Sequence, residues 1–302
     1  MSVLRLNLAV LVAATLLTGL TAAHAQNLAG PSAGSTVAAK PPAPLRVAVY
    51  AHEAPLIFKT GEKFSGVEAE LARGLGEELG RPVQFVETTL NDLIPSLLDD
   101  RADIVMSGLS LSKLREVRVA FCVPYLRSGQ VPLCRRGELA TYNNNEAFFN
   151  LRSTIGVVGN TTADVLVRSE FTYAHVVTFP TLADAVAALR DKKSDLLILD
   201  YPLALWQNAE NEASLALIPM FLNQEDYGWA VRKDDDALRT AANAYVAKIK
   251  ESGKLTEIVR KWIPSAADGA IGPVPLPNAP DALPVPTVVT PSAAPASVVP
   301  AK

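Results

Sequence analysis

The sequence predicts an α/β protein made of two Rossmann-like lobes joined by a hinge. Three observations support this fold class. Strand-like and helix-like segments alternate from residue 45 to residue 264, and the same β-α-β-α-β order occurs twice. In addition, one segment of each half resembles the other residue by residue. At roughly 100–200 residues per domain, a chain of 302 residues has room for two such lobes.

The first half opens with a strand and an amphipathic helix. An apolar residue recurs every four positions from Val67 to Leu79, and Gly80 ends the helix. Asn91 is expected to cap the next helix. The predicted strands of this half cover residues 46–50, 83–87 and 103–107.

The second half repeats this order. Its predicted strands cover residues 154–158, 174–178 and 195–199, with helices from 161 and over 181–191. A strand at 227–231 and helices at 236–252 and 255–262 complete the chain. Residues 97–104 (LLDDRADI) parallel residues 189–196 (LRDKKSDL), since each segment ends a helix and enters a buried strand through an aspartate. Two lobes of this kind bind small ligands between the carboxyl ends of their strands.

The two ends of the chain differ from its middle in composition. Residues 1–25 combine Arg5, an apolar run and an Ala23-His24-Ala25 motif, which predicts a signal peptide cleaved near Gln26; a membrane anchor is the alternative. Residues 26–44 are expected to form a flexible leader, and the Pro/Ala-rich residues 265–302 a disordered tail. Lobe 1 is then predicted to cover residues 45–124 plus 227–264, and lobe 2 residues 129–222.

Composition excludes several classes of function. The 28 basic and 31 acidic residues give a net charge of −3 without a basic block, so no nucleic-acid partner is expected. Three histidines and two cysteines predict no metal site, and Gly74-Leu-Gly76 lies inside a helix, so no cofactor is expected either. Cys122 and Cys134 are expected to be buried thiols, because extended chain separates them; a disulfide is the alternative.

Polar residues cluster after the third strand of the first half. Gly108 allows a ligand to approach the backbone, and Ser110 offers a hydroxyl. Ser112 can cap the following helix, which makes Arg115 its third residue. A helix N-terminus and a guanidinium together favour a carboxylate, although a surface arginine is the plainer interpretation.

Polar residues also end two strands of the second half. Thr161 and Thr162 supply hydroxyls and free N–H groups for an anion, although Thr is also simply a good helix cap. Asp200 ends a buried strand and is expected either to pair with an ammonium group or to cap the next helix. An arginine and an aspartate on opposite sides of a cleft describe a site for a zwitterion, which predicts an amino-acid receptor.

At this point the chain resembles solute-binding protein family 3, the periplasmic receptors of polar amino-acid ABC importers. The matching segments are 66–72 (GVEAELA), 93–97 (LIPSL), 103–115, 121–125 (FCVPY), 195–200, 227–228 (YG) and 261–262 (KW). The resemblance implies a type II periplasmic binding protein fold. It also implies that Arg115 holds the ligand's α-carboxylate and that Asp200 holds its α-amine. It places Gly108, Ser110 and Thr162 beside the carboxylate.

Several positions depart from the family, among them Asn160 in the turn before Thr161 and both Tyr50 and His52. The residues that usually stack on the ligand as aromatic rings are here Glu53 and Leu90. Glu53 either favours a cationic ligand side chain or is a solvated glutamate at the rim. Ligand identity therefore does not follow from the resemblance.

The resemblance implies a monomeric receptor that closes on an amino acid and presents it to a permease of the inner membrane. Residues 106–129 also resemble the exported cyclohexadienyl dehydratases, which offers an enzymatic alternative. The catalytic glutamate of those enzymes corresponds here to Ala163, so we expect no enzyme activity. A sensory or cell-wall-associated binding module is a third possibility.

Overall fold

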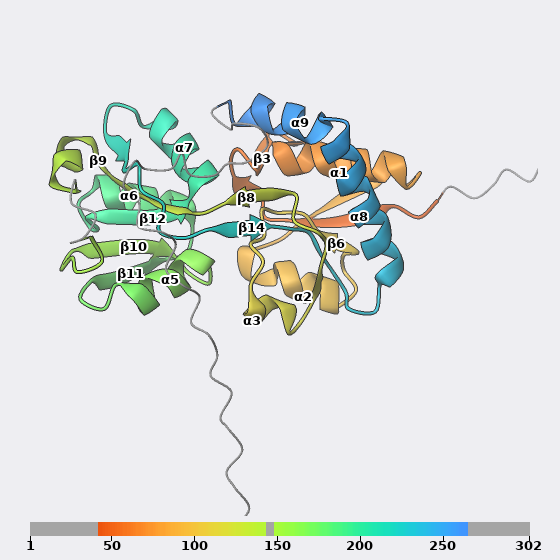
Figure 1. Cartoon of the computed structure of the whole chain (residues 1–302), viewed down its shortest axis with the longest axis horizontal. Coiled ribbons are helices and arrows are strands. Elements are labelled where there is room, and N and C mark those ends of the chain that lie inside the picture. The colour runs from red at the N-terminus through yellow and green to blue at the C-terminus, as the bar shows by residue number, and fades with distance from the viewer. Residues whose placement is uncertain (1–41, 143–147, 265–302) are drawn as a thin grey trace, which may run out of the picture. The chain divides into compact units, whose positions relative to one another are not determined.

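The computed structural model describes residues 42–142 and 148–264. Their strands form two five-stranded sheets, a two-stranded ribbon and a small three-stranded sheet (Figure 1). The predicted signal peptide, the leader up to residue 41 and the predicted tail lie outside the described residues.

The first sheet and its helices are called lobe 1 below. Its strand order is β5-β1-β6-β15-β7. The strands are β1 (Leu45–Val49), β5 (Val83–Glu87), β6 (Ile104–Val105), β7 (Ala120–Phe121) and β15 (Ala230–Val231). β1 runs parallel to both β5 and β6, whereas β15 runs antiparallel to β6 and β7.

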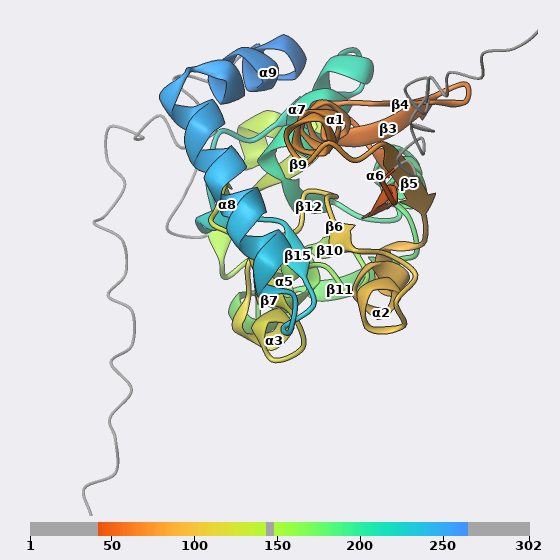
Figure 2. The ribbon, with the colours of Figure 1, turned by 90° about the vertical axis from the view of Figure 1, so that its right-hand side faces the viewer.

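Alternation along β1 explains why helices cover both faces of this sheet. Val47 and Val49 pack on α1 (Val67–Glu78), α8 (Asp236–Glu251) and α9 (Lys254–Trp262). Ala48 points to the other face and packs on α2 (Leu93–Leu98). Figure 2 shows α2 across the strands from α8 and α9.

The second sheet and its helices form lobe 2. The order is β11-β10-β12-β9-β13, in which only β9 runs antiparallel to its neighbours β12 and β13. The strands are β9 (Gln130–Arg135), β10 (Thr154–Val158), β11 (His175–Phe179), β12 (Leu196–Asp200) and β13 (Leu215–Leu217). One face packs on α5 (Thr162–Glu170), and the other on α6 (Leu182–Arg190) and α7 (Tyr201–Glu210).

Two strands connect the lobes. β8 (Leu126–Ser128) and β14 (Glu225–Tyr227) pair antiparallel and run side by side between the two sheets (Figure 1). The single strand predicted at 227–231 is therefore wrong, because its first residue belongs to this ribbon and only Ala230–Val231 join the first sheet. The ribbon lies between the predicted lobes, except that its last residue, Tyr227, falls in the range predicted for lobe 1.

The similar segments of the two halves have the same structural role. The carboxylate of Asp103 accepts a hydrogen bond from the Arg46 N–H at 3.0 Å, and Asp195 accepts one from the Thr154 N–H at 2.8 Å. Each aspartate also donates its own N–H to the carbonyl of the same partner. In both lobes an aspartate thus joins the starts of two parallel strands.

Two local predictions fail near the N-terminal end of lobe 1. The sequence showed no sign of a small sheet formed by β2 (His52–Glu53), β3 (Ile57–Thr60) and β4 (Lys63–Ser65), whose short strands lack a clear alternation. Asn91 does not cap α2, since it lies within a 3₁₀ turn (Leu90–Asp92) and Asp92 holds the N-cap position. The Asp92 carboxylate bonds Arg101 instead of the helix.

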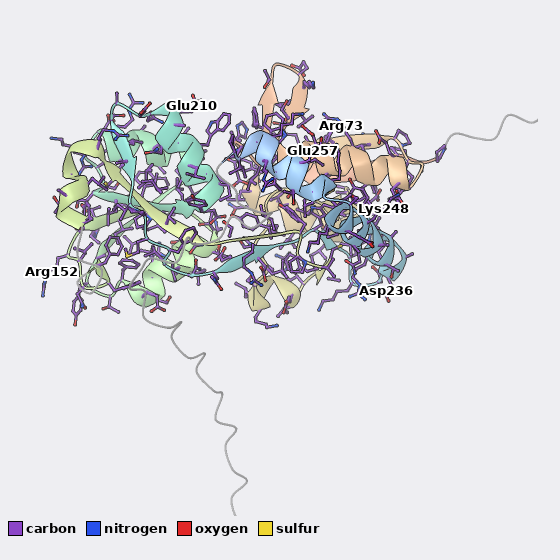
Figure 3. The ribbon with its side chains drawn as sticks, turned by 45° about the horizontal axis from the view of Figure 1, so that its top comes forward. Arg73, Arg152, Glu210, Asp236, Lys248 and Glu257 are labelled. Atoms are coloured by element: carbon purple, nitrogen blue, oxygen red, sulfur yellow. The ribbon has the colours of Figure 1, made fainter. Side chains whose placement is uncertain are left out.

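Charged side chains lie on the outer faces of the helices. Lys248 on α8 and Glu257 on α9 are exposed, as Figure 3 shows.

Cys122 and Cys134 are both buried and free, as expected. Across residues 42–142 and 148–264, no group of His, Cys, Asp and Glu side chains is arranged to hold a metal ion. The described helices include none with the length and apolarity to cross a membrane.

Candidate functional site

The loop after β6 has the geometry that the sequence predicted. Ser112 occupies the N-cap of α3 (Lys113–Glu116) and accepts a hydrogen bond from the Arg115 N–H at 3.3 Å. Gly108 has a φ of +59°, a left-handed conformation that L side chains rarely adopt, so a substitution there would be strained.

Arg115 is a largely buried cation. Its guanidinium donates to the Ser110 carbonyl at 2.8 Å, and Ser110 in turn pairs its backbone with Tyr227 of the ribbon. Burial lowers the pKa of Arg115, an effect opposed by the carboxylates of Asp200, Glu225 and Glu53. In the part of the chain that the structure describes, no carboxylate forms an ion pair with it. Because α3 is a single turn, the guanidinium is the main anion-binding group here.

Asp200 ends β12 and does not cap the next helix. It occupies the N-cap position of α7, but its side chain makes no capping hydrogen bond. The carboxylate instead lines a cavity. Burial and the nearby Glu225 raise the pKa of Asp200 well above its ordinary range, while Tyr227, Gln130 and Arg115 oppose that shift. The capping interpretation of Asp200 is therefore wrong, and its pairing with an ammonium group stays a prediction.

The two threonines are both engaged in hydrogen bonds. Thr161 caps α5 by accepting from the Asp164 N–H, and its hydroxyl donates to the Val158 carbonyl at 2.7 Å. The Thr162 hydroxyl donates to Glu225 at 2.9 Å and accepts from Gln130 at 2.8 Å. The predicted role of these hydroxyls as anion donors is therefore not what the geometry offers, and only N–H groups of the first turn of α5 remain.

A cavity of about 30 Å³ brings part of the predicted site together. Of the predicted site residues, Glu53, Thr161 and Asp200 line it, whereas the others do not: Arg115, Gly108, Ser110, Thr162 and Leu90. The lining residues are Tyr50, Glu53, Val158, Thr161, Ala163, Leu182, Ile198, Leu199, Asp200 and Leu203. Leu90 packs against the hydrophobic core. A volume of about 30 Å³ is far below the roughly 300–1,000 Å³ of ligand pockets, so a bound amino acid requires the walls to separate.

The ribbon contributes a polar cluster that the sequence analysis missed. Glu225 accepts hydrogen bonds from Thr162, Gln130 and Asn223 at 2.9–3.1 Å. Gln130 and Glu225 are 95 residues apart, so their proximity has no local sequence signal. The buried hydroxyls of Ser128 and Tyr227 make no hydrogen bond of regular geometry with described groups, although Tyr227 lies close to Asp200.

Glu68, also missed, holds the loop that carries Gly108. This fully buried carboxylate accepts three hydrogen bonds, from the Gly108 N–H at 2.6 Å, the Tyr125 hydroxyl at 2.7 Å and the Trp229 indole at 2.9 Å. It therefore ties α1 to the loop and to the end of lobe 1 from which the ribbon starts. The signal for it was an acidic residue in the first turn of an amphipathic helix, which usually indicates a helix terminus only.

Residues 45–265 match the family of bacterial extracellular solute-binding proteins, family 3. This match covers the whole described fold. The chain belongs to that family. As a solute-binding protein it has the type II periplasmic binding protein fold, with two α/β lobes connected by crossing strands.

Individual relatives of this solute-binding protein have different functions. The cyclohexadienyl dehydratase of Pseudomonas aeruginosa is 26% identical over 224 residues, 72% of this chain and 82% of that protein. The ABC transporter glutamine-binding protein GlnH of Bacillus subtilis is 26% identical over 204 residues, 67% of this chain and 73% of that protein. A crystal structure of a mutant ArgBP from T. maritima superposes with a TM-score of 0.65 at 30% identity, covering 73% of this chain and 95% of that one.

Proposed function

We propose that this solute-binding protein is a periplasmic receptor for a free amino acid, which it captures between its lobes and delivers to an ABC importer. One observation carries the proposal. Arg115 of lobe 1 is a partly buried guanidinium to which no described carboxylate is ion-paired, and Asp200 of lobe 2 is a partly buried carboxylate that makes no capping hydrogen bond. Buried charges of opposite sign are normally paired, so this arrangement supports a ligand that carries both charges.

The two charges act on opposite ends of the same ligand. The guanidinium of Arg115 receives the α-carboxylate through charge-assisted hydrogen bonds. The carboxylate of Asp200 receives the α-ammonium group. Because the two residues belong to different lobes, a zwitterion satisfies both only when the lobes approach. The ligand therefore binds the closed arrangement better than the open one and shifts the population toward it.

The setting of the receptor follows from its family and relatives. The family consists of extracellular proteins, and GlnH of Bacillus subtilis is an ABC transporter component. We propose that the chain is exported by its N-terminal segment, acts as a monomer and docks on an inner-membrane permease. Lobe closure gives the permease a means to distinguish the loaded receptor from the empty one.

A thermal-shift screen of the purified protein against the common amino acids tests the proposal. A ligand present at about 100 times its dissociation constant adds roughly 2.7 kcal/mol to the free energy of unfolding. At least one amino acid is expected to raise the melting temperature, and calorimetric titration then gives its affinity. If no amino acid changes the melting temperature, the proposed function is wrong.

A second candidate function is a dehydratase, favoured by the relative from Pseudomonas aeruginosa and by an acidic side chain in the cavity. Ala163 lines the cavity at the position of the catalytic glutamate and has no proton to give. Glu53 is a protonatable carboxyl on another wall of the cavity. Incubation with prephenate or arogenate, with the Pseudomonas enzyme as positive control, is expected to give no decarboxylated product. Turnover that is lost in Glu53→Gln would establish the enzyme instead.

A further inference from the structure

Glu53 is an acidic side chain for which the binding of a simple zwitterion leaves no partner. It lies at the end of β2 in lobe 1 and lines the cavity together with Asp200 of lobe 2. No described side chain or backbone group hydrogen-bonds or pairs with its carboxylate. The residue is half-buried and lines the cavity.

The charges around the cavity do not balance. Three carboxylates, of Glu53, Asp200 and Glu225, act on the single guanidinium of Arg115. Glu225 is satisfied by its hydrogen bonds to Thr162, Gln130 and Asn223. A zwitterion adds one charge of each sign, which Arg115 and Asp200 take up. Glu53 is then left half-buried without a counter-charge, which is unfavourable for an ionised group.

We propose that the ligand carries a second positive charge on its side chain and that Glu53 receives it, so that the site selects cationic amino acids. This inference rests on the proposed function, since it assumes that the α-carboxylate and α-ammonium group occupy Arg115 and Asp200. It assigns Glu53 as the specificity-determining residue.

The apolar walls fit the rest of such a ligand. Val158, Leu182, Ile198 and Leu203 line the same cavity. Cationic side chains consist of an aliphatic stem and a charged head, and they bury the stem while the head keeps a polar partner. Tyr50 and Leu182 also line a neighbouring groove of about 690 Å³, into which a long side chain can extend once the walls separate.

A bound proton takes the place of the missing cation in the ligand-free protein. Burial raises the pKa of Glu53 to about 8, and the nearby carboxylates of Asp200 and Glu68 add to this effect while Arg115 opposes it. At pH 7 the carboxyl is therefore mostly protonated. A cationic side chain favours the ionised form and displaces the proton, whereas a neutral side chain leaves it in place.

Calorimetric titrations with L-arginine and with L-citrulline, its uncharged analogue, test this inference. A charged hydrogen bond contributes about 1.5–3 kcal/mol, so the wild type is expected to prefer arginine by about ten- to hundredfold. Titrations at pH 7 in phosphate and in Tris, which differ in ionisation enthalpy, should show close to one more proton released with arginine than with citrulline, because the proton of Asp200, whose pKa is also raised, is displaced by the α-ammonium group of either ligand.

The variant Glu53→Gln is expected to lose the preference and the additional proton release with arginine while it still binds citrulline. Glu62→Gln, an exposed glutamate in the β3–β4 turn, is the matched control and should behave as the wild type. Equal affinities for arginine and citrulline in the wild type, or an unchanged preference in Glu53→Gln, would contradict the proposed role of Glu53. Either result would leave the proposed function standing. If neither these ligands nor any other amino acid binds, the proposed function and this inference both fail.

Discussion

Arg115 is the residue on which the proposed binding of an amino acid depends most. Within the described part of the chain its guanidinium hydrogen-bonds only to the Ser110 carbonyl, so its removal is expected to leave the fold intact. Arg115→Ala should weaken amino-acid binding by about 2–5 kcal/mol, roughly 30- to several-thousandfold, because the ligand carboxylate loses a desolvated partner. Calorimetric titration measures the affinity, and a thermal melt of the ligand-free variant checks the fold.

Arg118 is the matched control, because it lies just after Arg115 in the chain and its side chain is exposed. Arg118→Ala should change the affinity by less than twofold. If the Arg115→Ala variant is folded and binds its amino acid as tightly as the wild type, Arg115 does not bind the ligand's α-carboxylate.

The sequence predicted site residues where the chemistry is local. Ser112 caps α3 and brings Arg115 to its third position, as the spacing indicated, and Asp200 ends its strand. The roles that it missed depend on contacts between distant segments. Thr162 is bonded to Glu225, 63 residues away, and Glu68 is bonded to Trp229, 161 residues away. Hydroxyls and carboxylates have many possible partners, and only the fold selects among them.

At the scale of elements, Asp103 joins β1 and β6 in lobe 1 as Asp195 joins β10 and β12 in lobe 2. Asp103 is 10% exposed and pairs with Arg46 and Arg81, whereas Asp195 is 41% exposed and pairs with Arg135. In Asp103→Asn the amide oxygen can still accept a hydrogen bond, but the amide NH₂ group would face an arginine, which is also a donor. It is expected to lower the free energy of unfolding by about 1–3 kcal/mol, and Asp195→Asn by less.

The effect of Asp103→Asn should also depend on pH. Burial acts to raise the pKa of Asp103, but the bonds to Arg46 and the charge of Arg81 outweigh it and lower the pKa below its usual 3.8. A depressed pKa stabilises the fold above the unfolded value, and this contribution is lost as the pH falls through the folded value. At pH 7, urea unfolding should therefore give a higher free energy of unfolding for the wild type than for the variant. This difference should shrink below about pH 4. A gap that is constant down to pH 3 would contradict the ionic role of Asp103.

Regular elements followed from periodicity, and irregular ones did not. The helices α1, α6 and α8 begin and end within one or two residues of their predicted bounds, because their apolar stripes face a sheet. The similar segments even share a backbone detail, since Asp100 and Lys192 both have a φ near +60° after their helices. The small β2–β4 sheet and the division between β14 and β15 depend on which strands pair with which. Strands this short carry no local sequence pattern that predicts their partners.

At the scale of the molecule, the account requires the lobes to move. Arg115 and Asp200 stand on different lobes, and the cavity near them holds about 30 Å³, too little for an amino acid. Ligand entry therefore requires an open arrangement, and ligand binding restores a closed one. The ribbon of β8 and β14 is the only connection between the two sheets among the described strands, which makes it the element that bends.

A distance measurement between the lobes is the most direct test of the proposal that the protein captures an amino acid by lobe closure. Arg152 in lobe 2 and Asp236 in lobe 1 are both exposed, and Figure 3 marks their positions. Spin labels on Arg152→Cys and Asp236→Cys will react selectively, because burial raises the pKa of Cys122 to about 12 and of Cys134 to about 11 and leaves both thiols inert. Double electron–electron resonance then gives the distance distribution with and without the best amino acid of the screen. The account predicts a broad distribution that becomes narrow and short with ligand, and a smaller change at the same concentration in Asp200→Asn. A distribution that does not change although the amino acid is bound would contradict capture by lobe closure.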